Sequence, residues 1–429
     1  MMEQEELKRK LMGLWEKTTH SSKELIATLF NYYFNPKYME YKENDGKIVS
    51  ALLGIPYTFG YNKKYLKGIY LISLSSEEGF QKKGNISELF NAFHKKLANE
   101  FDFTFIVPHS ELIADFYSNH GYWSSFFILE ERFTPLHDFK NDYLLSLTDS
   151  NEKIRNLKIS LFDEIRVEQK SPNDDLETKK ELAKFIEKIE SRGSSSTNLC
   201  HTENDLLYIM EEESIRNLTA YVAYDSENKI TGIAFIQKED IKRIRVVASY
   251  VTDICSHYAL LDYIKREFSD YSISINTSES KYQIHSIIQH NYAASNPKGG
   301  DLDTIVGSID IPFNLNRLLQ PMGMVRILRF ENILKYIAET RSDVDFQLQI
   351  RDYNPEGGEN TNDKRILYKV KNGEFVREIV DSKTINSSIL NLSIKEVSEL
   401  LLRKKDTSNL IMEAFGIPRL DLQLRLLPC

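Results

Sequence analysis

Three stretches decide the fold of this sequence: Leu74-Ser75-Ser76, Gln81-Lys82-Lys83-Gly84-Asn85-Ile86 and Phe116-Tyr117-Ser118-Asn119-His120-Gly121-Tyr122. The first closes a run from Gly68 to Ser75 that is rich in β-branched and large apolar residues, which predicts a buried strand. Apolar residues then recur at helical spacing from Ser87 to Phe101, so we expect a helix there. The second stretch therefore lies in the loop between a strand and a helix.

The loop before this helix has the composition of an anion-binding site. A helix N-terminus carries unpaired backbone N–H groups and partial positive charge, so it binds phosphates readily. Gly79 and Gly84 let the backbone come close to a ligand, and Lys82 and Lys83 add positive charge. These residues favour a site that cradles a pyrophosphate. An ordinary glycine-capped loop is the alternative, and Glu77–Glu78 oppose phosphate binding.

An aromatic cluster follows the next apolar strand, which we expect from Asp102 to Pro108. Phe116, Tyr117, Tyr122 and Trp123 lie close together in the sequence, so at least two of them must pack in a core. Taken alone, Tyr117 has the pattern of a core residue. Its place after a loop, a helix and a strand favours instead a tyrosine hydroxyl held near a bound ligand.

In this order of elements the sequence resembles the GNAT superfamily of N-acetyltransferases, whose loop pattern is [Q/R]-x-x-G-x-[G/A]. Gln81 and Gly84 match the pattern, whereas Ile86 stands where the pattern has a small residue. This departure is similar to the Eis-like (enhanced intracellular survival) branch, which tolerates a bulky aliphatic residue there. Tyr117 matches the tyrosine that lies close to the CoA sulfur in that branch. The resemblance covers essentially the whole chain, with its specific motifs in residues 68–123.

The Eis-like resemblance implies an α+β (mixed α/β) chain of three parts. Residues 1–140 would form a catalytic GNAT domain with the acetyl-CoA site. Residues 141–316 would form a degenerate second GNAT-like domain, and residues 317–429 a domain like sterol carrier protein. One departure is that helical sequence, Glu3–Lys17, stands where a GNAT domain has its first strand.

The resemblance also implies the reaction, which is transfer of an acetyl group from acetyl-CoA to a primary amine by direct attack. Tyr117 would be the general acid for the CoA thiolate, and a backbone N–H of the bulged strand Leu74–Ser76 would polarise the thioester carbonyl. The terminal carboxylate, here on Cys429, would orient the amine or accept its proton; for this tail, a plain packing strand is the alternative. The residues implied in CoA binding are Leu74, Ser75, Ser76, Gln81, Lys82, Lys83, Gly84, Asn85, Ile86 and Phe116.

The second part is expected to repeat elements of the first. A hairpin with the turn Asn44–Gly46 lies before the candidate loop, and a second hairpin is expected at Thr219–Gln237. No Gly-rich loop follows that second hairpin, so a second CoA site is not expected. The other elements expected here are a strand at Leu157–Ile165, a helix at Leu176–Ile189, a mobile polar segment at Ser191–Asn198, a strand at Ile244–Thr252 and a helix at Tyr258–Phe268.

The third part shows alternating short strands and helices. Lys371-Asn372-Gly373 predicts a hairpin turn. We expect a structural role for this part, because no apolar pattern that would line a lipid tunnel stands out. The elements expected are strands at Met324–Leu328, Phe346–Ile350, Ile366–Val370 and Phe375–Ile379, and helices at Glu331–Ala338 and Ile394–Leu402.

Composition narrows the class of protein. The 429 residues are 41% hydrophobic and 28% charged, as in soluble globular chains. A net charge of −8 gives no electrostatic support for nucleic-acid binding. The first residues lack the apolar core of a signal peptide, and no apolar run reaches membrane-spanning length, so we expect a cytoplasmic protein. Three cysteines, Cys200, Cys255 and Cys429, cannot all pair, which is consistent with a reducing compartment.

The histidines offer weaker candidates. Cys255 with His257, and the pair His285 and His290, lack the closed four-ligand spacing of a metal site, so no metal is expected. His109 stands at the expected end of a strand near the candidate site. It is a candidate for CoA contact or proton relay, and a polar residue at a helix start is the alternative.

Two other functions compete with the enzyme. One is a non-catalytic scaffold that binds acyl-CoA, which the acidic pair near the loop and the missing first strand favour. The other is a lipid-binding module that uses the C-terminal part. For the enzyme, the resemblance implies a small-molecule or lysine-type amine as the acceptor and a homo-oligomer, since hexamers are common among Eis-like proteins.

Overall fold

The computed structural model describes most of the chain. The described residues are 2–19, 21–61, 63–80, 85–108, 110–147, 152–170, 175–191, 197–215, 218–239, 242–278, 316–350, 364–381, 389–402 and 422–423. They form the mixed α/β fold that the sequence predicts. Within these segments, no helix combines the length and the apolar character needed to cross a membrane.

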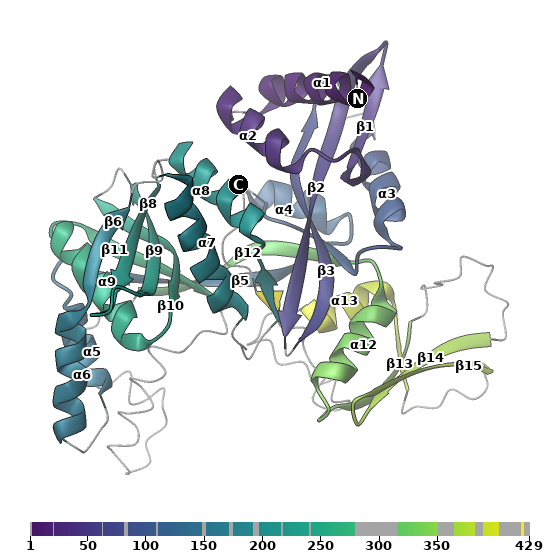
Figure 1. Ribbon diagram of the computed structural model, residues 1–429. Coiled ribbons are helices and arrows are strands. Elements are labelled where there is room, and N and C mark those ends of the chain that lie inside the picture. Colours follow the sequence, from purple (N-terminus) through teal and green to yellow (C-terminus); the bar gives the residue numbers. More distant parts are fainter. Residues whose placement is uncertain are drawn as a thin grey trace.

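The first part of the chain forms one half of a large sheet with helices on both faces (Figure 1). The predicted hairpin is confirmed: it turns at Asp45 and Gly46, whose φ values of 50° and 74° lie in the left-handed region that this turn requires. The elements are α1 (Met2–Thr18), α2 (Lys23–Tyr33), the 3-10 helix η1 (Pro36–Tyr38), β1 (Met39–Asn44), β2 (Lys47–Tyr61), β3 (Lys64–Ser76), α3 (Asn85–Leu97), β4 (Phe103–Ile106), α4 (Glu111–Ser118) and β5 (Trp123–Phe133).

The second part continues the same sheet and also carries helices on it. Its predicted hairpin is confirmed as β8 and β9, with a turn at Asn228, which has a positive φ of 62°. The elements are α5 (Phe139–Ser146), α6 (Glu152–Glu164), β6 (Arg166–Lys170), α7 (Leu176–Ser191), β7 (Thr197–Cys200), α8 (Glu203–Ile215), β8 (Leu218–Tyr224), β9 (Ile230–Glu239), β10 (Arg243–Val251), α9 (Ile254–Glu267) and β11 (Ser272–Ser278).

Two expectations for the second part are corrected. The strand expected at Leu157–Ile165 is wrong, because residues 157–164 belong to α6 and Ile165 follows it. Alternating apolar residues suggested a strand, but the helix turns Phe162 into the core, where its ring stacks on Tyr143 at 4.9 Å. The polar segment expected to be mobile ends in β7, and its residues 192–196 lie outside the described residues.

The third part adds a small sheet of four strands in the order β15-β14-β13-β16. The predicted turn is confirmed at Asn372 and Gly373, which have positive φ values of 51° and 83°. The elements are β12 (Asn316–Ile327), α12 (Phe330–Thr340), β13 (Asp345–Ile350), β14 (Lys364–Lys371), β15 (Glu374–Asp381), β16 (Leu390–Leu392), α13 (Ile394–Leu402) and β17 (Leu422–Gln423).

The large sheet joins all three parts of the chain. Among the described residues its order is β17-β7-β2-β3-β4-β12-β5-β11-β10-β9-β8-β6, with β1 on β2. Strand β12, expected to open the third part, runs antiparallel to both β4 and β5 and lies between them. Strand β7 of the second part pairs with β2 of the first. The sheet therefore crosses the boundaries expected at residues 140 and 316.

The sheet of the first part has a different set of helices on each face. Helices α3 and α4 cover the face that presents Ile69 and Leu71, and the core there includes Phe90 and Tyr117. Helices α1, α2, α7 and α8 contribute to the larger core on the opposite face, which presents Tyr57 and other residues of β2. Among the candidate CoA residues, Leu74, Ile86 and Phe116 pack against the core of the α3–α4 face.

A short pattern of elements occurs twice along the large sheet. In the first copy β2 and β3 form an antiparallel pair with a bulge, α3 follows, and β4 returns parallel to β3. In the second copy β9 and β10 form an antiparallel pair with a bulge, α9 follows, and β11 returns parallel to β10. The start of α9 therefore corresponds by topology to the start of α3.

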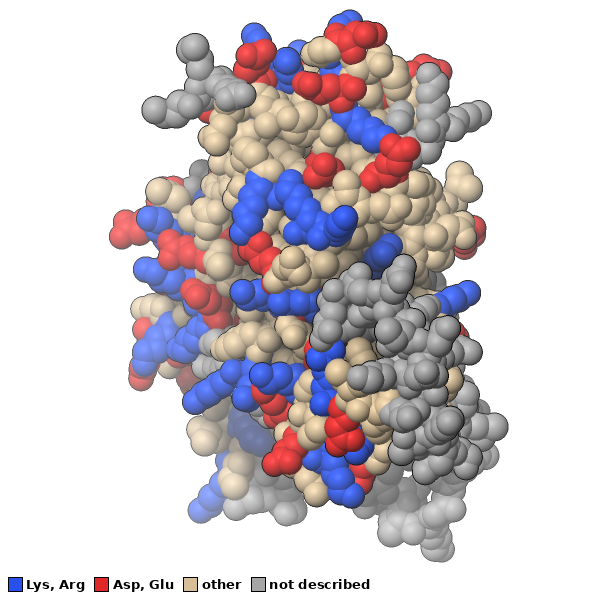
Figure 2. All heavy atoms as spheres, turned by 90° about the vertical axis from the view of Figure 1, so that its right-hand side faces the viewer, with Lys and Arg blue, Asp and Glu red and all other residues tan. Residues whose placement is uncertain are grey.

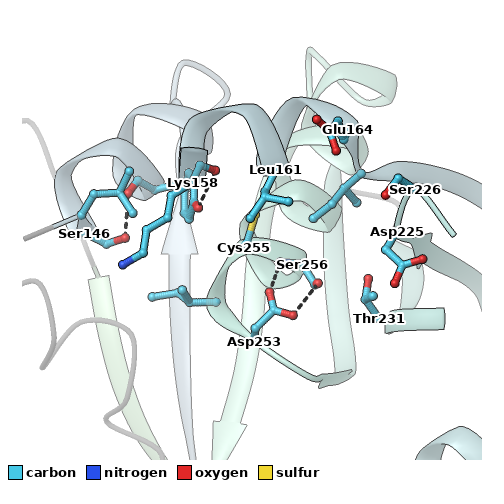
Figure 3. A pocket seen from close by; sticks show the side chains of 14 residues that line it. Ser146, Lys158, Leu161, Glu164, Asp225, Ser226, Thr231, Asp253, Cys255 and Ser256 are labelled. Carbon is cyan, nitrogen blue, oxygen red and sulfur yellow. Dashed lines mark hydrogen bonds between the residues drawn. The ribbon is translucent and has the colours of Figure 1, made fainter. Parts of the chain in front are cut away.

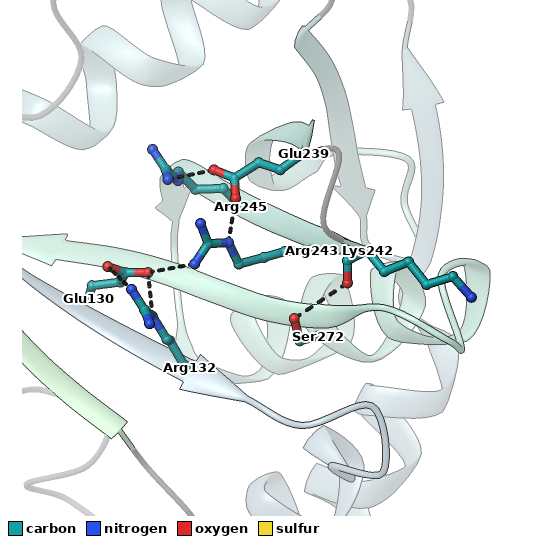
Figure 4. A network of polar contacts seen from close by, with 7 residues as sticks. All are labelled: Glu130, Arg132, Glu239, Lys242, Arg243, Arg245 and Ser272. Carbon is teal, nitrogen blue, oxygen red and sulfur yellow. Dashed lines mark hydrogen bonds and ion pairs between the residues drawn. The ribbon is translucent and has the colours of Figure 1, made fainter.

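A chain of ion pairs crosses the sheet where the two copies meet (Figure 4). Glu130 of β5 is buried and accepts hydrogen bonds from Arg132 at 2.8 and 3.1 Å. Arg243 of β10 lies 3.7 Å from Glu130 and also pairs with Glu239 of β9. Arg245 pairs with the same Glu239 at 2.5 Å. The network holds β5 to β10 and β9 across β11, and Arg132 lowers the pKa of Glu130.

The surface carries both signs of charge close together. On the face shown in Figure 2, Lys and Arg side chains gather near the middle, with Asp and Glu side chains around them. Exposed ion pairs such as Lys37–Glu100 and Lys140–Asp163 are of the kind that contributes little to stability.

Asp102 connects β3, β4 and the third part. Its carboxylate accepts a hydrogen bond from the Lys67 backbone N–H at 2.7 Å and is 2.6 Å from the guanidinium of Arg329. The same carboxylate accepts a hydrogen bond from the Asn332 side chain at 2.9 Å, and its own backbone carbonyl accepts from Leu328 N at 2.8 Å. Asp102 is 3% exposed, so its removal would leave several polar groups without a partner in a dry place.

We predict that Asp102→Ala lowers the free energy of unfolding by about 3–5 kcal/mol, the usual cost of breaking a buried pair. Urea unfolding followed by circular dichroism measures this change. Asp163→Ala is the matched control, because it removes an exposed carboxylate and should cost less than about 1 kcal/mol. Equal losses in the two variants would contradict the role given to Asp102.

Candidate functional site

The candidate site begins where β3 and β4 separate. The two strands pair in parallel from Gly68 to Tyr70 only, and β3 then continues to Ser76 along β2. Ala51 is opposite Ser75 and Leu53 is opposite Ile72, so Leu52 faces two residues of β3 and the strand bulges there. On its β4 side, beyond Tyr70, β3 presents backbone N–H and C=O groups that pair with no described strand.

The predicted bulge is confirmed, and it lies one residue earlier than expected. It comprises residues 73 and 74, so it includes the candidate residue Leu74 and directly precedes Ser75 and Ser76. The Ser75 hydroxyl is buried and has no hydrogen-bond partner among the described residues, and the Ser76 hydroxyl bonds to Ser50 at 2.8 Å. A buried polar atom without a partner beside an open strand edge is what a polar ligand would satisfy.

The loop from β3 to α3 is only partly described. Gln81, Lys82, Lys83 and Gly84 lie outside the described residues, and Asn85 begins α3. Glu77, which opposed phosphate binding in the sequence, forms an ion pair with Lys17 of α1 at 3.5 Å. Part of its negative charge is therefore compensated.

Tyr117 lies on α4 within the core of the α3–α4 face. Its side chain is 5% exposed, and its ring is 5.3 Å from that of Phe116, 5.8 Å from Phe90 and 5.6 Å from Tyr122. Burial raises the pKa of Tyr117, so its hydroxyl stays protonated at neutral pH. No described residue hydrogen-bonds this hydroxyl, which leaves its proton available to a ligand.

Several candidate residues meet in this core. Leu74 of β3, Ile86 of α3 and Phe116 of α4 are partly buried and pack against the cluster that contains Tyr117. The structure thus brings together residues that are up to 43 positions apart in the sequence, from Leu74 to Tyr117. Of the other candidates, His109 and Cys429 lie outside the described residues, as do His285 and His290.

The end of α4 sets the position of Tyr117. Gly121 has a φ of +80°, and the Tyr122 N–H donates to the Tyr117 carbonyl at 3.1 Å, as in a glycine-ended helix. Arg326 of β12 donates to the His120 carbonyl at 2.5 Å. A strand from the third part therefore helps to hold the helix that carries the candidate acid.

A buried polar chain lies beneath Tyr117. The Tyr122 hydroxyl is 2.8 Å from both the Thr104 hydroxyl and His94 Nε2. Burial, with smaller contributions from Arg326 and His120, lowers the pKa of His94 to about 2. His94 Nδ1 is buried and has no hydrogen-bond partner among the described residues. His94 is therefore neutral in the folded protein. The hydrogen-bonded side chains of His94, Tyr122 and Thr104 form part of the core on which Tyr117 packs.

His120 connects the two helices of this face, and no role was assigned to it from the sequence. Its Nδ1 donates to the Phe116 carbonyl at 2.8 Å, and its Nε2 is 3.0 Å from the Ser87 hydroxyl in the first turn of α3. The signal was visible in the sequence as a histidine within the aromatic cluster, directly before Gly121. The contact fixes the start of α3 against the end of α4.

The opposite face of the separated strands is backed by tyrosines and carboxylates. Tyr57 of β2 lies next to Phe105, with ring centres 6.1 Å apart. Burial and the nearby Tyr33 and Asp205 raise the pKa of Tyr57 well above its usual range. Tyr33 donates to Asp205 at 3.0 Å. Helices α2 and α8 thus place a buried carboxylate behind the point where β3 and β4 part.

The tail of the chain returns to the large sheet. Leu422 and Gln423 form β17, which runs parallel to β7 and pairs with Thr197 and Asn198. Strand β7 in turn pairs with β2. Cys429 is six residues beyond Gln423, and an extended chain of six residues reaches at most about 20 Å.

Comparison with solved structures supports the fold, whereas comparison of the sequence found no match. No protein-family model matches the chain, and no curated protein matches its sequence. Solved structures are similar over most of its length. A conserved protein of unknown function from Enterococcus faecalis V583, a probable N-acyltransferase, has a TM-score of 0.61 at 13% identity over 92% of this chain and 87% of its own.

Two further structures are similar to a comparable degree. Eis1 from Mycobacterium abscessus has a TM-score of 0.60 at 10% identity, with 93% of this chain and 87% of Eis1 covered. A GCN5-related N-acetyltransferase from Anabaena variabilis has a TM-score of 0.56 at 11% identity, with 92% and 87% covered. The chain therefore has the fold of GNAT-type N-acetyltransferases.

The neutral, buried His94 predicts a pH-dependent loss of stability. Unfolding lets His94 take up a proton below its ordinary pKa of about 6.5, so stability falls as the pH drops through that value. Between pH 7 and pH 5 this loss should reach about 2 kcal/mol. Urea unfolding at both pH values checks it. His94→Gln cannot titrate, so it should lose about 2 kcal/mol less over this range; an unchanged pH dependence would contradict the assignment.

Proposed function

We propose that this protein is an acetyl-CoA-dependent N-acetyltransferase that acts on a primary amine. The observation that carries the proposal is the open, bulged edge of β3, which faces Tyr117 of α4 through a shared core. A non-catalytic protein that only needed this fold would not need a tyrosine at the same place whose side chain is buried and whose hydroxyl has no described hydrogen-bond partner. The GNAT fold supports acyltransferase chemistry in general, and the acetyl group and the amine are part of the proposal.

The residues present fit an acyl-CoA. Amide groups of a pantetheine arm can pair with the backbone of β3 just beyond Tyr70, where β3 no longer pairs with β4, as an added strand does at a sheet edge. The Ser75 hydroxyl provides a further buried partner. Gln81–Gly84 and the first turn of α3 are the proposed phosphate site, because a helix start favours anions. Bound acetyl-CoA supplies the activated acyl group.

Each side chain of the proposed mechanism has a defined task. A backbone N–H at the β3 bulge polarises the thioester carbonyl, and Tyr117 donates its proton to the departing thiolate. The phenol keeps its proton until the thiolate forms, because burial raises the pKa of Tyr117. The chain of His94, Thr104 and Tyr122 and the contact from Arg326 hold the helix in place.

The acceptor side is proposed to lie on the opposite face, next to Tyr57 and Tyr70. Asp205 and the buried pair of Glu190 with His201 place negative charge there, which favours a cationic amine over an anion. The terminal carboxylate of Cys429 is proposed to orient the amine or accept its proton, since β17 brings the tail to the edge of the same sheet.

We also propose that residues 141–316 are a degenerate copy of the first domain and that the C-terminal part is like sterol carrier protein. The repeated order of strands, bulge and helix supports the first statement. The small sheet with α12 and α13 supports the second. A scaffold that binds acyl-CoA without turnover is the alternative function, and the turnover test below separates the two.

We predict that Tyr117→Phe lowers kcat by about 100-fold or more, the usual contribution of a general acid, and leaves the KM for acetyl-CoA within about threefold. Release of free CoA thiol with a panel of primary amines is the measurement. Tyr65→Phe is the control, because it removes the hydroxyl of an exposed tyrosine outside this core and should leave kcat unchanged. Normal turnover by Tyr117→Phe would remove this residue from the mechanism.

A further inference from the structure

The second part of the chain contains a pocket of about 500 Å³ that shares no residue with the candidate active site (Figure 3). It lies between α5 and α6 on one side and the start of α9 on the other, and the turn between β8 and β9 closes one end. In Figure 1, α5, α6 and α9 lie at one end of the molecule and α3 and α4 lie elsewhere. A volume of this size is typical of small-molecule sites.

The pocket lies at the start of α9, which corresponds to the start of α3 in the repeated pattern of elements. The start of α9 follows β10 as the start of α3 follows β3, and Asp253, Ile254, Cys255 and Ser256 at this start line the pocket. In the first part the corresponding place is the proposed phosphate site. The second copy therefore has an opening at the position that corresponds by topology to the proposed phosphate site.

The charged side chains that line the opening are mainly negative, whereas a phosphate would need positive charge. The carboxylate of Asp253 accepts a hydrogen bond from the Ser256 N–H at 2.8 Å, so a side chain already takes the anion position at the helix start. Asp225 and Glu164 add two more carboxylates to the lining, against the single ammonium of Lys158. Figure 3 shows Lys158 on the side away from Asp225. An anionic ligand would meet net repulsion here.

The wall of the pocket is mainly apolar. Leu147, Leu161, Ile165 and Ile254 contribute aliphatic surface, and Tyr143 contributes an aromatic ring. Burial raises the pKa of the Cys255 thiol to about 11, so this cysteine is a neutral part of the wall that reacts slowly with thiol reagents. The lining therefore suits an apolar body, and the carboxylates suit a positively charged end.

We propose that this pocket binds a small amphiphilic amine, with its apolar body among α5, α6 and α9 and its ammonium group beside the carboxylates of Asp225 and Glu164. The site is separate from the active site and does not depend on turnover. It is a binding site without chemistry, because the structure places no activated nucleophile in it.

Cys255 allows a direct test on the full, unmodified chain. The rate at which N-ethylmaleimide labels Cys255, followed by peptide mass spectrometry, is measured with n-octylamine, octanoate or octanol at matched concentrations. We expect octylamine at about four times its Kd to slow the labelling about fivefold, since a bound ligand protects in proportion to occupancy. Octanoate should change the rate by less than about twofold.

Variants of the acidic lining separate charge from shape. Asp225→Asn with Glu164→Gln keeps the hydrogen bonds that Asp225 accepts from the backbone of its turn, and should remove the preference for octylamine over octanol. Glu177→Gln, an exposed residue of α7 that does not line the pocket, is the matched control and should keep it. Equal protection by octylamine and octanoate, or none by octylamine, would overturn the proposal.

Discussion

The hydrogen bonds of Asp102 are the constraint on which the rest of the structure depends. They join β3 to β4 at the end where the two strands pair, through the Lys67 backbone, and they join both strands to the third part through Arg329. With that end closed, the strands are free to part beyond Tyr70, where the bulge lies. The same contacts place β12 beside β4, and β12 supplies Arg326 to the end of the helix that carries Tyr117.

Two copies of one arrangement of strands and helix have different electrostatics at the same place. In the first copy the loop before α3 contains glycine and lysine, and the start of the helix has no acidic cap among the described residues. In the second copy Asp253 caps α9, and carboxylates line the opening above it. A helix start binds an anion only while no side chain of the protein takes that place. A single capping residue can thus change the charge that a helix start presents in two copies of one arrangement.

Local signals predicted much of this structure. The turns at Asp45–Gly46 and Asn372–Gly373 have a required conformation, and the spacing of apolar residues in α3 and α9 matches a buried helical face. The insertion of β12 between β4 and β5 could not be predicted, because it depends on pairing between residues more than 180 positions apart. The strand expected at Leu157–Ile165 failed because alternation over a few residues resembles one face of a short helix.

The candidate site was predicted in part. The order of loop, helix and strand indicated Tyr117, and the bulge of β3 was expected within one residue of its position. The polar chain of His94, Thr104 and Tyr122 was missed, because its members come from separate elements and meet only in the folded core. The catalytic role of Tyr117, the CoA-binding residues with the phosphate loop, the terminal carboxylate, the oligomer and the sterol-carrier likeness stay predictions.

Calorimetric titration of acetyl-CoA into the wild-type chain and into Gly84→Trp tests the central claim most directly. The account predicts binding by the wild type and at least a tenfold weaker Kd in the variant, a loss of about 1.4 kcal/mol or more, because a large side chain at Gly84 blocks the approach of the backbone to the phosphates. Absence of binding to the wild type, or equal binding by both proteins, would contradict it.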